Sequence, residues 1–280
     1  MLIDLHTHSQ CSDGLLTVEE LVKLAARKKV KILALTDHDT TIGLPSFIKI
    51  CAQHKIEPIP GLELSTAVRG VEMHLVGYLK NFNDPKLLAI LKKQQAKRME
   101  RAKILIKRFR SLNFVITKTT EKQLLSQKNT GKPQFTRAIL KEQANLSLLK
   151  NKYGWQGNLS DFIGSFLDRP GQIGYLKKQR LNSLAAIELI KKCGGLVSLA
   201  HPDIELAESK TAQKIIPLLV KAGLWGMEMP HNFLKNKKHL LPLAEKYKLA
   251  ITYGSDSHDG KRLGINVGKT EWQKIDYLLN

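Results

Sequence analysis

Six of the nine histidines in this 280-residue chain lie in or directly after short apolar segments. His6 and His8 form one pair, and Asp256 and His258 form a second pair near the other end of the sequence. Residues two apart in an extended strand point to the same face, so each pair can offer two side chains to one metal ion. The other candidates of this kind are His38, His74, His201 and the carboxylate of Glu63.

The three remaining histidines do not share this position. His54 and His239 fall in predicted helices or loops, and we expect them to be ordinary solvated residues. His231 follows a predicted strand, and the sequence leaves its role undecided.

Imidazole and carboxylate ligands without thiolates suit divalent ions such as Mn²⁺, Zn²⁺ and Fe²⁺ held in open, catalytic sites. The candidates outnumber the ligands that one ion needs, and a carboxylate such as Glu63 can bridge two ions. Two ions about 3.5–4 Å apart stabilise both the attacking and the leaving oxygen of an in-line displacement at phosphorus. The ligand set therefore predicts a metal-dependent phosphoesterase.

Short apolar strands alternate with helices along most of the chain, which predicts an α/β fold with a parallel sheet. Seven strands are expected, at Leu2–Leu5, Lys31–Thr36, Ile56–Leu64, Val71–Leu79, Gly195–Ala200, Gly226–Met229 and Ala250–Tyr253. Most candidate ligands lie at or just past the C-terminal end of such a strand, and in a closed (β/α) barrel that end carries the active site. Because the standard barrel has eight strands, we predict an irregular (β/α)7 barrel with a helical insert.

Five helices are expected among these strands. They span Thr17–Lys29, Gly43–His54, Ser183–Cys193, Ala212–Ala222 and Leu240–Tyr247. We expect Thr17 and Glu20 to open the first helix as a capping box, and Ser183 to be the N-cap of the third.

The alternation of strands and helices stops after about residue 80 and resumes near residue 176. This interruption begins with a helical segment at Lys86–Leu112, in which apolar residues recur at helical spacing. We therefore predict a discontinuous barrel domain at residues 1–80 and 176–280, and a helical insert domain at residues 81–175.

The formal net charge of +20 favours anionic partners such as phosphates and nucleic acid. Ten Lys or Arg residues and one acid, Glu100, occur between Lys86 and Arg110 in the insert. Such lysines would add a sequence-independent, salt-sensitive attraction to nucleic acid. The chain has no RNP-like aromatic pattern, so base-specific recognition of RNA is not expected.

Cysteine usage and hydropathy indicate the compartment. Cys11, Cys51 and Cys193 are far apart and form no C-x-x-C motif, which fits a reducing cytoplasm. No apolar run approaches the roughly 18 residues of a membrane span, and the first residues do not resemble a signal peptide. We expect a cytoplasmic protein with no membrane contact and no obligate protein partner.

Taken together, the motifs resemble the PHP (polymerase and histidinol phosphatase) family of metal-dependent phosphoesterases. They are, in chain order, His6-x-His8, Asp13-Gly14, Thr36-Asp37-His38-Asp39, Gly61-x-Glu63, His74, Ala200-His201-Pro202 and Gly254-Ser255-Asp256-x-His258. Within the family, the chain most resembles the small bacterial nucleoside 3′,5′-bisphosphate phosphatases and short-RNA 5′ exonucleases. Two motifs in the insert, Arg98-x-x-Arg101 and Gly131-Lys-Pro133-x-Phe135-x-Arg137, resemble those of this subgroup. Lys132 and Gln134 depart from its common Gly-Arg-Pro-His sequence.

The resemblance implies two or three divalent ions, with Mn²⁺ favoured and Zn²⁺ or Fe²⁺ as alternatives. The first ion would be held by His6, His8, Glu63 and Asp256. The second would share Glu63 and add His74 and His201. A third site would use Asp13, His38 and His258, with Asp13 standing where trinuclear relatives often carry a histidine.

The resemblance also implies that Arg98, Arg101 and Arg137 bind the substrate. The first two are three residues apart on a helix and share a face, and guanidinium forks match phosphate oxygens. We expect Asp37 to orient a neighbouring metal ligand, and Asp39 to have a structural role.

The expected reaction is hydrolysis of nucleotide phosphomonoesters by a metal-activated hydroxide, without a covalent phosphoenzyme. The expected substrates are nucleoside 3′,5′-bisphosphates or short 5′-phosphorylated RNA, with histidinol phosphate as the alternative. Hydrolysis of C–N bonds, as in amidohydrolases, is a second class. A carbamylated lysine ligand would favour it, but residues 71–79 contain no lysine. A non-catalytic metal-binding module is a third class.

Overall fold

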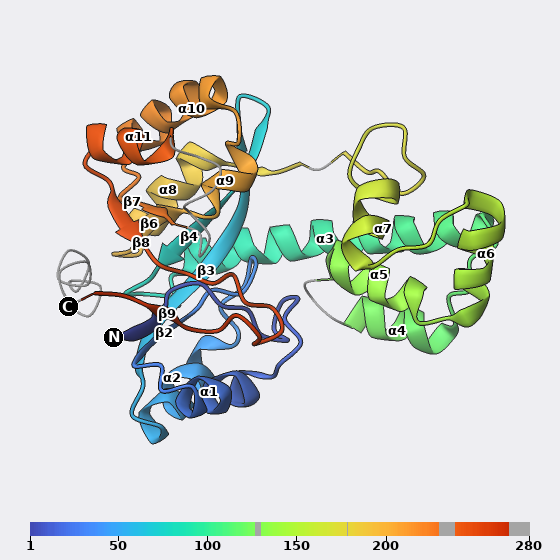
Figure 1. Cartoon of the computed structure of the whole chain (residues 1–280), viewed down its shortest axis with the longest axis horizontal. Helices are drawn as coiled ribbons and strands as arrows, with labels where there is room; N and C mark the ends of the chain where they lie inside the picture. The colour runs from blue at the N-terminus through green and yellow to red at the C-terminus, as the bar shows by residue number, and fades with distance from the viewer. Residues whose placement is uncertain (127–129, 178, 230–238, 269–280) are drawn as a thin grey trace. The chain divides into compact units, whose positions relative to one another are not determined.

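The computed structural model describes residues 1–126, 130–177, 179–229 and 239–268 of the chain (Figure 1). The chain divides into two compact units, each with its own hydrophobic core. The barrel unit comprises Met1–Leu91 and Arg180–Asn280, and the insert unit comprises Lys92–Gln179. Among the described residues, no helix is both long and apolar enough to span a membrane.

Seven strands of the described residues form the wall of the barrel unit, and each corresponds to a predicted strand. They are β1 (Leu2–Asp4), β2 (Ile32–Leu35), β3 (Glu57–Val68), β4 (Val71–Tyr78), β6 (Leu196–Leu199), β7 (Gly226–Glu228) and β8 (Ala250–Thr252). Their order in the sheet is β8-β7-β6-β4-β3-β2-β1. Two short strands were not predicted: β5 (Leu181–Asn182) pairs with β3, and β9 (Ile265–Asn266) pairs with β1.

The two ends of this strand order are joined just beyond β1 and β8. The Leu5 N–H donates to the Tyr253 carbonyl at 2.9 Å. Further on, Thr7 and Ser257 form a parallel bridge, and the His8 N–H donates to the Ser257 carbonyl at 3.1 Å. The sheet therefore closes on itself, and the fold is the predicted irregular (β/α)7 barrel with a helical insert.

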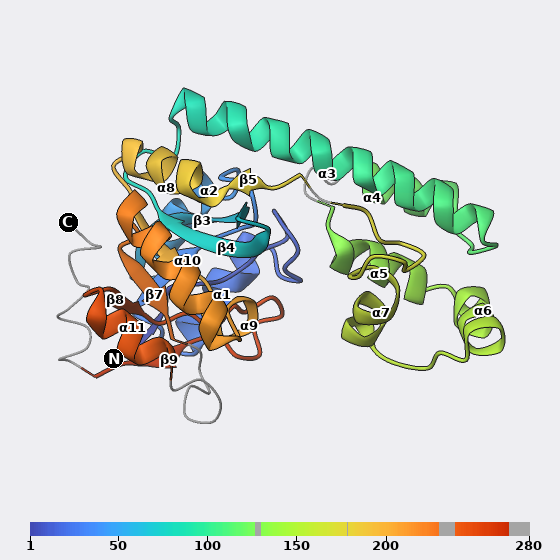
Figure 2. The same ribbon diagram turned by 90° about the horizontal axis from the view of Figure 1, so that it is seen from above.

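The prediction of a wholly parallel sheet was wrong, because β4 runs antiparallel to both β3 and β6. Arg69 and Gly70 connect β3 to β4, with φ of +50° and +80°. Two consecutive residues with positive φ suit a tight hairpin turn, whose twist matches that of the paired strands. The two strands lie side by side in Figure 2. Because of this reversal, His74 on β4 pairs with Ser65 on β3, two residues beyond Glu63.

Helices cover the outside of the barrel. These are α1 (Val18–Arg27), α2 (Leu44–Gln53), α8 (Ser183–Lys192), α9 (Pro202–Glu205), α10 (Ser209–Ala222) and α11 (Leu240–Lys246). In Figure 1, α1 and α2 lie on one side of the strands, and α8, α10 and α11 lie on the other. The interior is filled by apolar side chains of the strands, including Ile3, Leu5, Ile32, Ala34, Ile59, Val76 and Ala200.

The helix caps agree with the sequence in one case and differ in another. Thr17 and Glu20 form the predicted capping box at the start of α1. The N-cap of α8 is Asn182 rather than Ser183, because the Asn182 side chain accepts hydrogen bonds from the first backbone N–H groups of the helix. The Ser183 hydroxyl instead donates to Thr66 Oγ1 at 2.9 Å, which ties the helix to β3.

The insert unit is helical. Its elements are the later turns of α3 (Pro85–Ser111), then α4 (Lys118–Ser126), α5 (Lys132–Leu140), α6 (Gln143–Tyr153) and α7 (Leu159–Phe166). The first turns of α3 contribute Leu87 and Leu91 to the barrel core. Phe109, near the end of the same helix, packs against Phe135 and Phe162 at the centre of the insert core.

The core between α1, α2 and the strands can be tested at Phe47, which is fully buried there. Phe47→Ala should leave a cavity and lower the free energy of unfolding by about 3–5 kcal/mol, measured by urea denaturation. Ile42 is 60% exposed, so Ile42→Ala is the matched control and should change stability by less than about 0.5 kcal/mol. Equal effects of the two substitutions would contradict this packing.

Candidate metal centre

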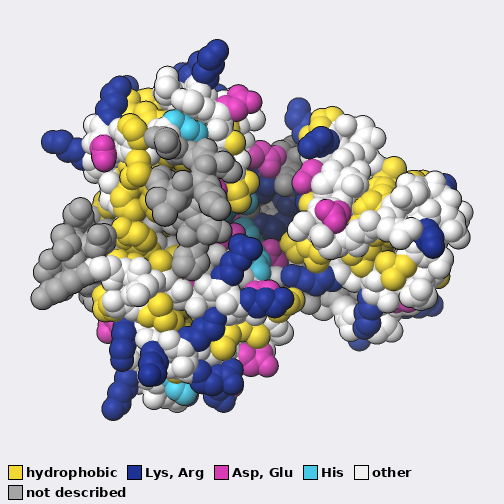
Figure 3. Space-filling model, viewed as in Figure 1, with side chains coloured by type: hydrophobic (Ala, Val, Ile, Leu, Met, Phe, Trp, Pro, Cys, Tyr) yellow, Lys and Arg dark blue, Asp and Glu magenta, His cyan; other side chains and the backbone are white. Residues whose placement is uncertain are grey.

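All nine predicted ligands lie in clusters at one rim of the barrel. In each cluster, the possible ligand atoms lie within 4.8 Å of one another. The clusters overlap, and they are His6, His8, Glu63 and Asp256; His8, Asp13, His38 and His258; His38, Glu63 and His74; and His74, His201 and Glu205. Figure 3 shows histidine and acidic side chains reaching the surface of the barrel unit near one another.

The first cluster has the dimensions of a metal coordination sphere. His8 Nε2 lies 3.1 Å from Glu63 Oε2 and 3.1 Å from Asp256 Oδ1, and His6 Nε2 lies 3.2 Å from the same Glu63 oxygen. Ligands about 2.1 Å from a tetrahedral ion are about 3.4 Å apart. The Nε2 atoms of His6 and His8 face each other at 3.1 Å, an arrangement that requires a proton or a cation beside them.

The carboxylate of Glu63 directs its two oxygens to different histidines. Oε2 lies 3.2 Å from His6 Nε2, 3.1 Å from His8 Nε2 and 3.1 Å from His38 Nδ1. Oε1 lies 3.0 Å from His201 Nε2 and 3.4 Å from His74 Nδ1. This is the arrangement that a carboxylate bridging two ions needs.

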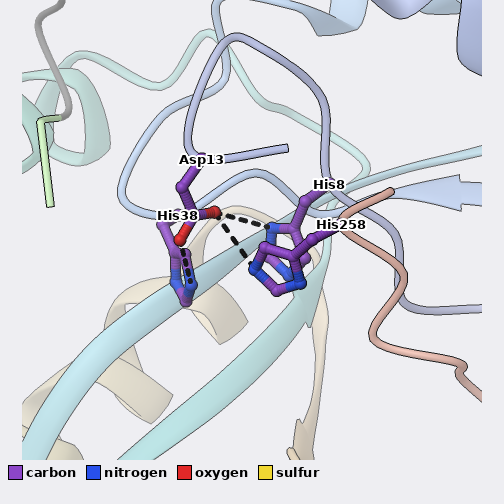
Figure 4. Close-up of side chains that lie close together, drawn as sticks. All are labelled: His8, Asp13, His38 and His258. Atoms are coloured by element: carbon purple, nitrogen blue, oxygen red, sulfur yellow. Dashed lines mark ion pairs between the residues drawn. The ribbon is translucent and has the colours of Figure 1, made fainter. Parts of the chain in front are cut away.

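Asp13 is the centre of the second cluster, formed with His8, His38 and His258 (Figure 4). Its Oδ1 lies 3.2 Å from His258 Nε2 and 4.0 Å from His8 Nδ1, and its Oδ2 lies 3.8 Å from His38 Nε2. The predicted set of Asp13, His38 and His258 is thus brought together, and His8 adds its second ring nitrogen to it.

Residues 4–195 match the model of the PHP domain family. The chain belongs to the PHP domain family.

Three curated relatives of this PHP domain protein share most of its length. The 5′-3′ exoribonuclease Rnm of Escherichia coli is 27% identical, over 98% of this chain and 93% of the relative. The phosphoribosyl 1,2-cyclic phosphate 1,2-diphosphodiesterase of Eggerthella lenta is 30% identical, over 92% and 94%. The 3′,5′-nucleoside bisphosphate phosphatase of Chromobacterium violaceum is 28% identical, over 96% and 91%. These relatives match the subgroup predicted from the motifs.

One solved structure is also similar to this protein over nearly its whole length. An amidohydrolase from Chromobacterium violaceum, determined with bound sulfate, is 25% identical and has a TM-score of 0.82. The comparison covers 99% of this chain and 96% of that one. The helical insert is therefore included in the similarity.

The donor atoms of this PHP domain protein fit divalent ions. Buried atoms without a hydrogen-bond partner among the described residues include His8 Nδ1, His38 Nδ1, Glu63 Oε2, His74 Nδ1 and Asp256 Oδ1. A buried polar atom without a partner is costly, and here such atoms converge on the same clusters. Bound ions would satisfy them.

The electrostatics of the cluster agree with cation binding. Burial alone would raise the pKa of the Glu63 carboxyl, but nearby histidines, His38 first, hold it well below its usual range. Burial lowers the pKa of His8, yet the Asp256 and Glu63 carboxylates, each 3.1 Å from its Nε2, outweigh burial and raise the pKa to about 10. For His38, burial prevails and lowers the pKa to about 3. The carboxylates stay ionised at neutral pH and attract cations, whether protons or metal ions.

Two buried carboxylates that were not predicted hold candidate ligands in place. Glu228, at the end of β7, lies 3.0 Å from His6 Nδ1 and accepts the His201 N–H at 2.8 Å. Asp4 accepts from the Ser255 N–H at 2.9 Å and its hydroxyl at 2.6 Å. Burial raises the pKa of Asp4 to about 6. Glu228 lies at the end of a predicted strand, as several candidate ligands do, so the sequence contained a signal for its place near the site.

Asp37 and Asp39 both contact the backbone near the ligands. Asp37 accepts from the Ser9 N–H at 2.8 Å and from the Ser12 hydroxyl at 2.5 Å, so it holds the loop that carries Asp13. Asp39 accepts from the Ser65 N–H at 3.1 Å.

Two of the predicted ligands have unusual backbone conformations. The φ angle is +26° at His201 and +50° at Asp256. Such values are costly for residues with a Cβ and persist only where the surroundings enforce them. Gly254 lies two residues before Asp256, and a Cβ there would clash with the Glu228 carboxylate and His6.

Among the described residues, the others considered in the sequence analysis do not belong to these clusters. Arg98 and Arg101 are on α3 and Arg137 is on α5, all half-buried in the insert unit. His54 is exposed, whereas His239 is half-buried, with Nε2 3.3 Å from the Leu206 carbonyl. His231 lies outside the described residues.

Glu63→Gln tests the shared carboxylate, because it keeps the shape of the side chain and removes its charge. We expect the variant to bind fewer Mn²⁺ ions than the wild type, with affinity at least about 10-fold weaker. Isothermal titration calorimetry and elemental analysis would measure both. His54→Ala, at an exposed position, should bind like the wild type. Unchanged stoichiometry and affinity in Glu63→Gln would show that Glu63 is not a ligand.

Proposed function

We propose that this protein is a metal-dependent phosphoesterase that acts on nucleotides carrying a 5′-phosphate and a phosphoester at the 3′ oxygen. Nucleoside 3′,5′-bisphosphates and short 5′-phosphorylated RNA both have this arrangement. The observation that supports the proposal most strongly is the position of the Glu63 carboxylate. Its Oε2 faces His6 and His8, and its Oε1 faces His74 and His201. Relatives named as an exoribonuclease and as a bisphosphate phosphatase support the substrate class.

The first two predicted sites would each hold a divalent ion, and we favour Mn²⁺ because the donors are imidazoles and carboxylates without thiolates. Such ions, when bound, acidify a water molecule and polarise a phosphoryl oxygen. Asp13, His38 and His258 would hold a third ion.

The chain's own residues would position the reacting groups. Glu63 keeps the two histidine pairs at a fixed separation, because it is fully buried and contacts both. Glu228 fixes the ring orientation of His6 through Nδ1, which directs Nε2 to the first site. Arg98, Arg101 and Arg137 are the proposed contacts to substrate phosphate, since guanidinium groups bind phosphate oxygens in a bidentate manner.

The insert unit has the charge that a nucleotide substrate requires. Residues 92–179 contain 20 of the 45 Lys and Arg residues but only 5 of the 25 Asp and Glu residues. This imbalance concentrates phosphates and nucleic acid near the unit. It supports a nucleotide substrate over histidinol phosphate, which carries a single phosphate.

The cyclic phosphate diesterase of Eggerthella lenta provides a second candidate function. Its name describes the cleavage of a cyclic phosphodiester, and the same metal chemistry at phosphorus would serve that reaction. A ribose 1,2-cyclic phosphate therefore belongs among the substrates to be tested.

The test is turnover in Mn²⁺ of 3′-phosphoadenosine 5′-phosphate, a short 5′-phosphorylated RNA, a ribose 1,2-cyclic phosphate and histidinol phosphate. We expect AMP and inorganic phosphate from the first, and nucleoside 5′-monophosphates from the RNA, both resolved by chromatography. EDTA should abolish turnover, and Glu63→Gln should lower kcat at least about 100-fold, since such ions contribute several kcal/mol to the transition state.

Other outcomes would reassign the function. Turnover of histidinol phosphate alone would overturn the nucleotide substrate, and turnover of the cyclic phosphate alone would favour the second candidate. Release of an amine from amide substrates, without phosphate from any ester, would indicate C–N hydrolysis of the amidohydrolase type. His54→Ala provides a matched control with normal turnover.

A further inference from the structure

Glu205 lies against two of the predicted metal ligands, although neither the motifs nor the family resemblance singles it out. Its Oε1 is 2.9 Å from His74 Nδ1 and 3.6 Å from His201 Nδ1, whereas His201 Nε2 is the nitrogen that faces Glu63. Its Oε2 accepts the backbone N–H of His74 at 2.6 Å. These three side chains form a cluster of their own with ligand atoms within 4.8 Å of one another.

We propose that Glu205 is a further ligand of the divalent ion held by Glu63, His74 and His201. The proposal rests on the proposed function, because it assumes that this ion is present. Glu205 would bind through Oε1, while Oε2 keeps its hydrogen bond to the His74 backbone.

The surroundings of His74 carry the proposal. Its Nδ1 lies 2.9 Å from Glu205 Oε1 and 3.4 Å from Glu63 Oε1. One ring nitrogen therefore faces oxygens of two carboxylates. A single proton on Nδ1 can be donated well to only one of them, whereas a divalent ion beside the nitrogen can bind both oxygens and the lone pair. His74 Nδ1 is buried and has no hydrogen-bond partner among the described residues.

The proposed ligand sets of the first two ions become equivalent when Glu205 is included. The first ion has His6, His8 and Asp256 with one oxygen of Glu63, and the second has His74, His201 and Glu205 with the other oxygen. Each ion is then held by two imidazoles and two carboxylates. Four protein ligands leave positions open on an ion that prefers six, such as Mn²⁺, for water and a phosphate oxygen.

The local chain geometry explains how Glu205 reaches this place. His201 has φ of +26°, and Glu228 Oε2 holds its N–H at 2.8 Å. Pro202 then opens α9, so that His201 and Glu205 are four residues apart and share a face. The Glu205 side chain is only 12% exposed. A carboxylate so little exposed needs a cationic or hydrogen-bonding partner to offset its lost hydration.

Glu205→Gln separates a ligand from a residue that only orients His74. Glutamine keeps the length and an oxygen that accepts the His74 N–H, but it is a much poorer ligand than a carboxylate. Glu205→Asp keeps the charge and provides a second variant if the first does not fold. Glu208→Gln, at an exposed position three residues further on, is the matched control.

The experiment measures metal binding rather than activity. Metal-free wild type and variants are titrated with Mn²⁺ by calorimetry, and the visible absorption of the Co²⁺-loaded proteins is recorded. We expect Glu205→Gln to lose one equivalent of metal or to bind one ion at least about 10-fold more weakly, with an altered Co²⁺ spectrum. Glu205→Asp should bind more tightly than Glu205→Gln, and Glu208→Gln should match the wild type.

Wild-type stoichiometry, affinity and Co²⁺ spectrum in Glu205→Gln would overturn the assignment, as would a wild type that binds no metal. If Glu205→Gln binds one ion fewer than the wild type, but the wild type hydrolyses no phosphoester, the result would support Glu205 as a ligand and contradict the proposed function. The two failures are therefore distinguishable.

Discussion

The carboxylate of Glu63 is fully buried and lies 3.0–3.4 Å from ring nitrogens of five histidines, His6, His8, His38, His74 and His201. A buried carboxylate is stable only when positive charge compensates its lost hydration. The imidazoles can provide that charge as protonated rings, or they can share it with bound cations. Most of the barrel rim is arranged to bring donors from separate strands to this one group.

Two features of the barrel make this convergence possible. Closure of the sheet beyond β1 and β8 places the segment with His6 and His8 beside the segment with Asp256 and His258. The hairpin at Arg69 and Gly70 reverses the chain, so that β4 brings His74 back towards Glu63. The strained backbone at His201 and Asp256 is tolerated because buried carboxylates and the neighbouring strands hold these segments.

The insert unit has a separate core and most of the excess positive charge. This division suggests different constraints on the two units. The candidate metal ligands lie on the barrel rim, and as ligands they would have to keep fixed distances. The insert has its own core, so a substitution on its surface does not change those distances. Lys132 and Gln134 are such departures from the common motif of the subgroup.

The sequence by itself determined the candidate ligands and the strands that carry them. Period-two spacing placed His6 and His8 on one face, and the ends of apolar strands marked Glu63, His201 and Asp256. The same patterns predicted the seven strands to within a few residues, because local hydrophobicity governs strand formation.

Only the tertiary structure decided which oxygen of Glu63 faces which histidine, and that β4 runs antiparallel. It also revealed Glu205 and Glu228, which lie 131 and 222 residues in sequence from the histidines they contact, His74 and His6. Contacts of this kind depend on strand order and on the path of loops between strands. No local pattern encodes them, because the free energy that holds them comes from burying groups that are distant in the chain.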